Sequence, residues 1–361
     1  MKSSLRHLTL RATALTLGLA ISSTFAMTAQ QISVVPGADA VGSIALKAFN
    51  AAPVVKKKRA TGNDEAIPWS AMTAAKRARF EVATGLAEDD IIAAAFSCDM
   101  DTLDLDADTS RGRSSSLRGL VAIQVSKAIS IDKLKTAIKL EYGTQDLAGV
   151  ADVAIGKQVG LKVNASKPSD PDIYLTLTPD GHIVLIALNT ESLAAALDRA
   201  ASGSLVREPS GLTQMRRALS GSQIQMACII PTRARESMQA KIDGMRQQMS
   251  QNPGLAMVMG FTQLFKGIKS LSVGLSVDTD ATLKLAGELG SEQEALQASV
   301  LLETMVIPLI LAQAATAGVG EKASELGKNV SVKSHEATLQ IQVTIPEDQI
   351  MGKAKTTPTV Q

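Results

Sequence analysis

The densest run of acidic residues in the chain offers the ligands that a metal ion would need. It comprises Asp99, Asp101, Asp104, Asp106 and Asp108. The last three have the alternate spacing with which a calcium-binding loop of the EF-hand type begins. Such a loop continues with a Gly and ends with a bidentate Glu, but Thr109 and Ser115 stand at those positions. Asp104, Asp106 and Asp108 therefore remain candidates for a looser calcium site only, and the alternative is a solvated strand face.

The same acids belong to a long connection between two expected strands, Ile91–Phe96 and Leu120–Val125. The later hairpin that we expect to correspond to it turns within Asp278–Ala281, so the first connection carries an insertion of about 16 residues. If the protein has a specific interaction surface, we expect it here, because connections of this length often carry function. The simpler interpretation is an ordinary charged loop. The candidate interaction residues are Asp99, Asp101, Arg111, Arg113 and Arg118.

Signatures of known catalytic sites are incomplete in this sequence. Ser130–Lys133 matches a Ser-x-x-Lys motif, but its companion motifs are absent, and we expect Ser130 to cap a helix. His182 and His335 have no nearby partner residue and are expected in turns. We therefore predict no catalytic residue and no cofactor. A hydrolase that uses only carboxylates from Asp99–Asp108 stays open as an alternative, because acid pairs leave no local pattern in a sequence.

Cys98 and Cys228 are the two cysteines of the chain, and both lie in or next to apolar runs that are typical of strands. We expect two buried thiols that pack as small apolar side chains. A disulfide between them is the alternative.

The elements that carry these residues are predicted to form two similar units. A nine-residue stretch, Gly156–Asn164, returns as Gly327–His335, with Gly, Lys, Val and a second Lys identical. Alternating and helical patterns predict the order β-α-β-β-α-β-β in each unit. The fold class that follows is α+β, with two tandem units, antiparallel sheets and helices packed on one face, related to the ferredoxin-like arrangement. Whether the two units share one continuous sheet stays open.

This layout resembles that of secreted bacterial proteins built from tandem α+β units. The resemblance covers the order of the elements and carries no site residue. The predicted boundaries are 38–202 for the first unit, 203–221 for a connecting helix and 222–348 for the second unit. A flexible segment at 27–37 is expected before them and a disordered tail at 349–361 after them.

The N-terminus has the pattern of an export signal. Lys2, Arg6 and Arg11 precede the apolar stretch Ala12–Ile21, and small residues lead to a cleavage position after Ala26. The apolar stretch is shorter than the ~20 residues of a membrane span. We therefore expect a signal peptide at 1–26 and a secreted or periplasmic protein with no transmembrane span in the exported chain.

The charge of the chain gives no support for binding to nucleic acid. Its formal net charge is +2, from 37 basic and 35 acidic residues. Three basic residues and no acidic residue lie in the expected signal, which leaves −1 for the exported chain. Aromatic residues make up only 2%, which disfavours stacking platforms for bases. We expect an exported, non-enzymatic binding or structural protein whose partner is another envelope or extracellular protein. Calcium-dependent adhesion through the acidic run is a further alternative.

Overall fold

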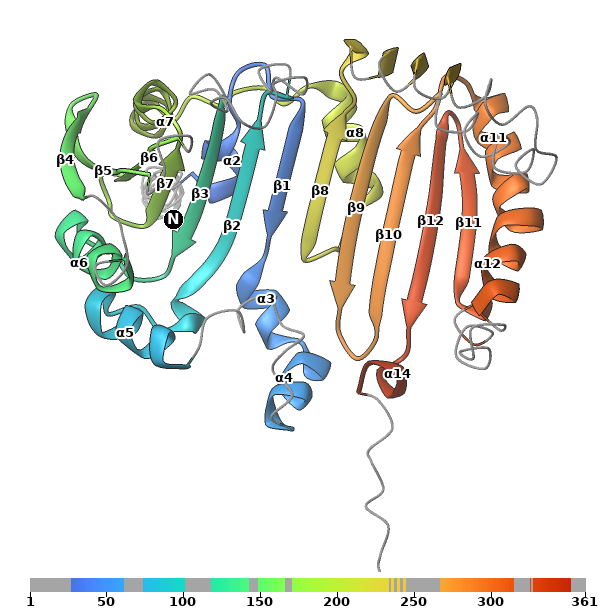
Figure 1. Cartoon of the computed structure of the whole chain (residues 1–361), viewed down its shortest axis with the longest axis horizontal. Coiled ribbons are helices and arrows are strands. Elements are labelled where there is room, and N and C mark those ends of the chain that lie inside the picture. Colours follow the sequence, from blue (N-terminus) through green and yellow to red (C-terminus); the bar gives the residue numbers. More distant parts are fainter. Residues whose placement is uncertain are drawn as a thin grey trace, which may run out of the picture.

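A single antiparallel sheet of twelve strands forms the centre of the part of the chain that the structure describes (Figure 1). This computed structural model describes residues 27–61, 74–100, 118–142, 149–165, 171–233, 235–236, 239–240, 243–244, 267–314, 325 and 327–351. The strands are β1 (Ala40–Ile44), β2 (Ile91–Cys98), β3 (Gly119–Val125), β4 (Val150–Ile155), β5 (Gln158–Val163), β6 (Ile173–Leu177), β7 (Ile183–Ala187), β8 (Ile224–Ile229), β9 (Ser270–Val277), β10 (Ala281–Glu288), β11 (Val330–His335) and β12 (Thr338–Ile345).

Helices precede, connect and follow these strands. They are α2 (Ala29–Ser33), α3 (Leu46–Ala51), α4 (Pro53–Ala60), α5 (Ala74–Thr84), α6 (Ile131–Tyr142), α7 (Thr190–Ser202), α8 (Ser210–Ala218), α11 (Glu292–Leu301), the π-helical stretch η6 (Leu302–Val306), α12 (Ile307–Ala314) and α14 (Glu347–Met351). The chain is therefore α+β with a large antiparallel sheet, as the sequence predicts at this level. None of the helices in the described ranges combines the length and the apolar composition that crossing a membrane requires.

The strand order joins the two halves of the chain in one sheet. It runs β11-β12-β10-β9-β8-β1-β2-β3-β7-β6-β5-β4. Strands β1 and β8 pair along five residues, from Ala40 opposite Cys228 to Ile44 opposite Ile224, and lie side by side at the centre of the sheet (Figure 1). The question that the sequence left open is thereby answered, because the sheet is continuous across the two halves.

The repeated nine-residue stretch falls on strands with different neighbours. Gly156 and Lys157 form the turn between β4 and β5, and β5 lies between β4 and β6. The second copy contains β11, an edge strand that pairs with β12. The likeness therefore does not mark equivalent positions in the sheet. Counted outward from the central pair, the order β1-β2-β3-β7-β6 faces the order β8-β9-β10-β12-β11.

The prediction that helices pack on one face of the sheet is wrong. Strand β7 shows why, since all five of its residues are apolar, a pattern typical of a strand buried on both faces. Leu185 is fully buried in a cluster with α2, α7 and α8. Its neighbour Val184 points to the opposite face and joins a cluster with side chains from α5 and α6. Helices therefore cover both faces at this end of the sheet.

The segment at 27–37, expected to be flexible, instead belongs to the core. Thr28 caps α2, accepting a hydrogen bond from the backbone of Gln31, whose side chain accepts from Thr28 in return. Ile32 is fully buried. A guanidinium nitrogen of Arg199 in α7 donates to the Ile32 carbonyl oxygen at 3.1 Å. Sequence reasoning missed this helix because α2 is only five residues long.

Two further expectations differ from the structure. The imperfect alternation at 41–49 predicts a strand, but β1 ends at Ile44, and α3 begins at Leu46. A disordered tail is expected from residue 349, but residues 349–351 belong to α14. Ile350 and Met351 of this helix pack against a cluster that contains Val54 of α4. Residues 1–26, with the expected signal, and 352–361 lie outside the described residues.

Candidate binding face

Three successive rows of residues cross the sheet on one of its faces. In antiparallel strands, residues directly opposite each other share a face. The first row is Gly119, Cys98, Ala40, Cys228, Leu271, Gly287, Leu339 and Ser334. The second is Val121, Phe96, Gly42, Met226, Val273, Leu285, Ile341 and Val332, and the third is Ile123, Ala94, Ile44, Ile224, Leu275, Leu283, Val343 and Val330. We call these three rows the apolar face, because Ser334 is their one polar member.

The opposite side of β8–β12 is largely polar. Its residues include Gln225, Ser272, Ser276, Thr282, Lys284, Gln340, Gln342, Thr344, Ser331 and Lys333. Helix α8 packs on this side, where the sulfur of Met215 lies 4.0 Å from the Ser272 hydroxyl. The apolar face is therefore turned away from α8.

Helices pack on the apolar face at three of its margins. Side chains of α5 and α6 cluster with Val125 and Ile123 at the β3 side. Side chains of α3, α4 and α14 cluster with Ile224, Leu275 and Val277 at one end of the strands. Residues of α11 cluster with Leu339 near the β11 edge.

Between these margins, large apolar side chains remain in contact with solvent. Val121 is 37% exposed, Met226 46% and Leu271 39%. They come from β3, β8 and β9, segments that are far apart in the sequence. A contiguous exposed apolar patch can mark a binding site, whereas single exposed apolar residues are common on any protein surface.

Cys98 and Cys228 belong to the first row of the apolar face, on either side of Ala40. Both are free thiols. Two strand spacings of about 4.8 Å separate their Cα atoms, beyond the roughly 7 Å that a disulfide allows. Burial raises the pKa of the Cys98 thiol, and the carboxylates of Asp39 and Asp99 raise it further. Burial also raises the pKa of Cys228, so both groups stay protonated at neutral pH and pack as weakly polar side chains.

The loop that the sequence singled out leaves the sheet at the end of this first row. Asp99 and Arg118 lie at its base, and the Asp99 backbone N–H donates to the Arg118 carbonyl oxygen at 2.9 Å. Asp101, Asp104, Asp106, Asp108, Arg111 and Arg113 lie in 101–117, outside the described residues. Within the described ranges, no three His, Cys, Asp or Glu side chains come together in a way that could hold a metal ion.

The other residues with possible chemistry have structural roles. Ser130 accepts a hydrogen bond from the Lys133 backbone N–H at 3.4 Å at the start of α6, which confirms it as a helix cap. His182 follows the turn between β6 and β7, where its Nδ1 lies 3.2 Å from the Val125 carbonyl oxygen. His335 is the exposed last residue of β11, directly before Glu336 in the turn to β12. Both histidines therefore lie at turns, as the sequence predicts.

A buried carboxylate marks the other end of β2 and β3. Asp90 accepts hydrogen bonds from Lys127 Nζ at 2.8 Å, Ser126 Oγ at 2.7 Å and the Ala87 backbone N–H at 2.9 Å. These contacts, that of Lys127 foremost, lower the pKa of Asp90 to about 2. A carboxylate with three donors and so low a pKa suits a structural role better than that of a general acid.

Sequence reasoning missed the apolar face as a site, although part of its signal was visible. Leu271, Val273, Leu275 and Val277 alternate with small or polar residues in the sequence, and so do the apolar residues of β12. This alternation indicates a sheet with one apolar face. The alignment of that face across eight strands comes from pairing between distant segments, which a local pattern cannot reveal.

Comparisons with known proteins assign no family. No protein-family model matches the chain, and no curated protein matches it. A solved structure described as crystal form I of TP0453 aligns over 90% of this chain and 96% of that chain, with a TM-score of 0.38 and 10% sequence identity. A likeness this weak establishes neither family nor function.

Proposed function

We propose that this chain is an exported, non-enzymatic binding protein that takes an apolar ligand on its apolar face. The observation that carries the proposal is the continuity of the three apolar rows, together with the exposure of Val121, Met226 and Leu271 between the framing helices. The tandem origin of the two halves also stays a proposal, supported by the matching strand order on either side of β1 and β8.

A ligand is expected on this surface because leaving apolar side chains in water costs free energy. Burial of apolar area contributes about 25 cal/mol per Å². A ligand that covers Met226 and its neighbours gains this free energy without needing hydrogen bonds, because the side chains of the three rows are apolar apart from Ser334 and the weakly polar thiols. Ligand selection would then rest on size and shape.

The roles of the chemically capable side chains support binding without catalysis. Ser130 caps α6, the thiols have raised pKa values, and Asp90 is held ionised by three donors. A nucleophile or general acid needs a pKa near the working pH and access to a substrate. The carboxylate hydrolase rests on Asp99–Asp108 and the calcium module on Asp104, Asp106 and Asp108; of these acids only Asp99 is described, and no observation in the described residues favours either alternative.

A dye titration tests the proposal. Nile red, whose fluorescence rises in apolar surroundings, should bind the purified protein, and Met226→Gln should weaken binding several-fold because it places an amide on the apolar face. Val159→Gln is the matched control, since Val159 is an exposed apolar residue of β5 outside the three rows. Equal affinity for the two variants, or no binding to the unchanged protein, would overturn the proposal.

A further inference from the structure

One end of the sheet leaves a strand with a partner on one side only. Strand β4 is the outermost strand there, and within the described residues it pairs with β5 alone (Figure 1). Hydrogen-bonded and non-bonded residue pairs alternate along antiparallel strands. Gly149 accepts a hydrogen bond from the backbone N–H of Asn164 at 3.2 Å, so every second residue after Gly149 also bonds towards β5. The residues between them direct their backbone N–H and C=O groups away from β5; they are Val150, Asp152 and Ala154.

Strand β4 carries little of the protection that proteins give to such an edge. An exposed strand edge is usually blocked by Lys, by Pro or by a β-bulge, because it otherwise binds further strands. Strand β4 has neither Lys nor Pro, and it pairs with β5 without a register shift. Its one charged residue is Asp152, whose two carboxylate oxygens each accept a hydrogen bond from Lys135 Nζ at 2.7 Å. At the opposite edge, α11 packs against β11, and Lys333 is exposed. The β4 edge is therefore the less protected of the two.

We propose that β4 pairs edge to edge with β4 of a second copy of this chain, in antiparallel orientation. Outward N–H and C=O groups recognise another strand, and a two-fold axis lets the same edge serve both copies. With Val153 opposite Val153 of the second copy, Asp152 exchanges two hydrogen bonds with Ala154 of that copy, and the same exchange occurs across the axis. A register with Asp152 opposite itself would bring two carboxylates together, which is destabilising. A shift of two residues to either side of Val153 would leave part of β4 unpaired, so the Val153 register is the favoured one.

The side chains of β4 suit this pairing. Ala151 and Ala154 are exposed and small, so a second strand can approach closely. Val153 is half-buried and would meet its own copy, and such pairs of β-branched residues stabilise antiparallel strands. Because opposite residues share a face of the sheet, the apolar faces of the two copies would lie on the same side of one continuous sheet. The inference goes beyond the proposed function and does not depend on which ligand the apolar face binds.

Sedimentation equilibrium of the purified protein tests the pairing. We expect the unchanged chain to form dimers. Ala154→Pro removes an N–H that points away from β5, so it should spare the β4–β5 hairpin and raise the dimer dissociation constant about tenfold. Ala154→Thr is the matched control, because it keeps the N–H and should dimerise as the unchanged chain does. An unchanged chain that is monomeric at every concentration measured, or equal dimerisation of the two variants, would overturn the inference.

A cross-link tests the register and does not depend on the proline variant. Val153→Cys places two thiols in a non-hydrogen-bonded pair across the two-fold axis, where Cα atoms lie about 4.5 Å apart, within the reach of a disulfide. Mild oxidation should therefore give a covalent dimer. In Ala151→Cys, the control, the two thiols are offset by about 13 Å along the strands and should not join. The unchanged chain shows the background from Cys98 and Cys228, and melting temperatures show that each variant is folded. Equal cross-linking of both variants, or cross-linking of neither, would refute the Val153 register.

Discussion

Cys98 and Cys228 lie opposite the same residue, Ala40, from its two sides. Strand β1 therefore separates two thiols that point to one face of the sheet, and its removal would be needed to bring them together. The pair marks the place where the two halves of the chain meet, because β2 belongs to one half and β8 to the other.

The first prediction concerns these thiols under oxidising conditions. The folded protein should form no disulfide between Cys98 and Cys228 during prolonged exposure to oxidised glutathione, because the strand spacing exceeds the reach of such a bond. The intact mass should lack the loss of two hydrogens. An intramolecular disulfide between Cys98 and Cys228 in protein with unchanged melting temperature would contradict the β1 placement.

The second prediction tests whether α2 belongs to the core. Ile32→Ala removes a fully buried side chain between the sheet and α7, and should lower the free energy of unfolding by about 2–4 kcal/mol. Gln30→Ala, on the less buried side of the same helix, is the control and should change it by less than about 0.5 kcal/mol. Urea denaturation measures both. Similar small effects would mean that the segment is not packed as described.

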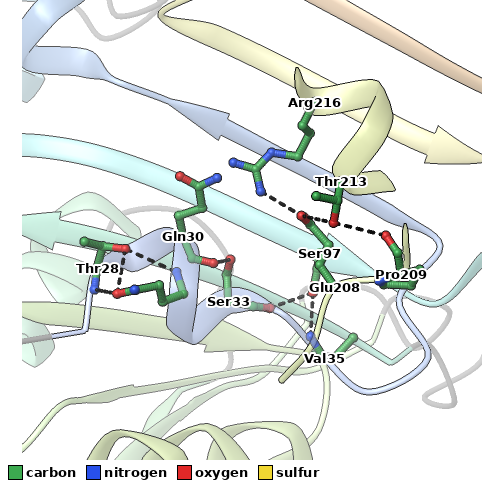
Figure 2. Close-up of polar contacts among 10 residues, drawn as sticks. Thr28, Gln30, Ser33, Val35, Ser97, Glu208, Pro209, Thr213 and Arg216 are labelled. Carbon is green, nitrogen blue, oxygen red and sulfur yellow. Dashed lines mark hydrogen bonds and ion pairs between the residues drawn. The ribbon is translucent and has the colours of Figure 1, made fainter. Parts of the chain in front are cut away.

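The third prediction concerns a buried hydroxyl that connects α2 to β2. Ser97 Oγ donates to the Ser33 carbonyl oxygen at 2.6 Å and accepts from the Val35 backbone N–H at 2.9 Å, as Figure 2 shows. Ser97→Ala leaves both backbone groups unpaired in the core, so it should cost about 2 kcal/mol in thermal or urea unfolding.

The control for this change is Ser276→Ala. Ser276 Oγ donates to the Gly221 carbonyl oxygen, but this contact is exposed, so water can replace the hydroxyl. We expect a loss below about 0.5 kcal/mol. If the two serine variants lose equal stability, the Ser97 hydroxyl does not hold the segment to the sheet.

Local sequence patterns were sufficient to predict many single helices and strands. The alternation in β9 and β10 and the short turn between them predict a hairpin, and the two strands pair as expected. Ser291 and Glu294 have the spacing of a capping box and predict a helix start, and Ser291 accepts a hydrogen bond from the Glu294 backbone N–H at 3.2 Å at the start of α11. In each case the residues that define the element interact with near neighbours in the chain.

Features that depend on pairing between segments far apart in the chain could not be predicted from local sequence patterns. Strand β1 is five residues long and gains its partners from β2 and β8, which begin about 50 and 180 residues later. The apolar stretch at 300–312 predicts a buried helix, but Val300 is 51% exposed and Met305 43%. The stretch continues from α11, which packs against β11 at the edge of the sheet. The apolar face has the same origin, since no single strand determines how its side chains align with those of the next.

The last prediction follows from the low pKa of Asp90. Because the pKa in the folded state, about 2, lies below the usual value of 3.8, the ionised carboxylate stabilises the fold. This contribution is fully present above the pKa of the unfolded chain and is lost as the pH falls from about 4 towards 2. Asp90→Asn should therefore flatten the dependence of unfolding free energy on pH in this range. Asp89→Asn, at the exposed neighbouring position, should leave the slope as it is. If both variants keep the slope of the unchanged protein in urea titrations between pH 2 and pH 5, Asp90 is not held ionised by Lys127, Ser126 and the Ala87 backbone.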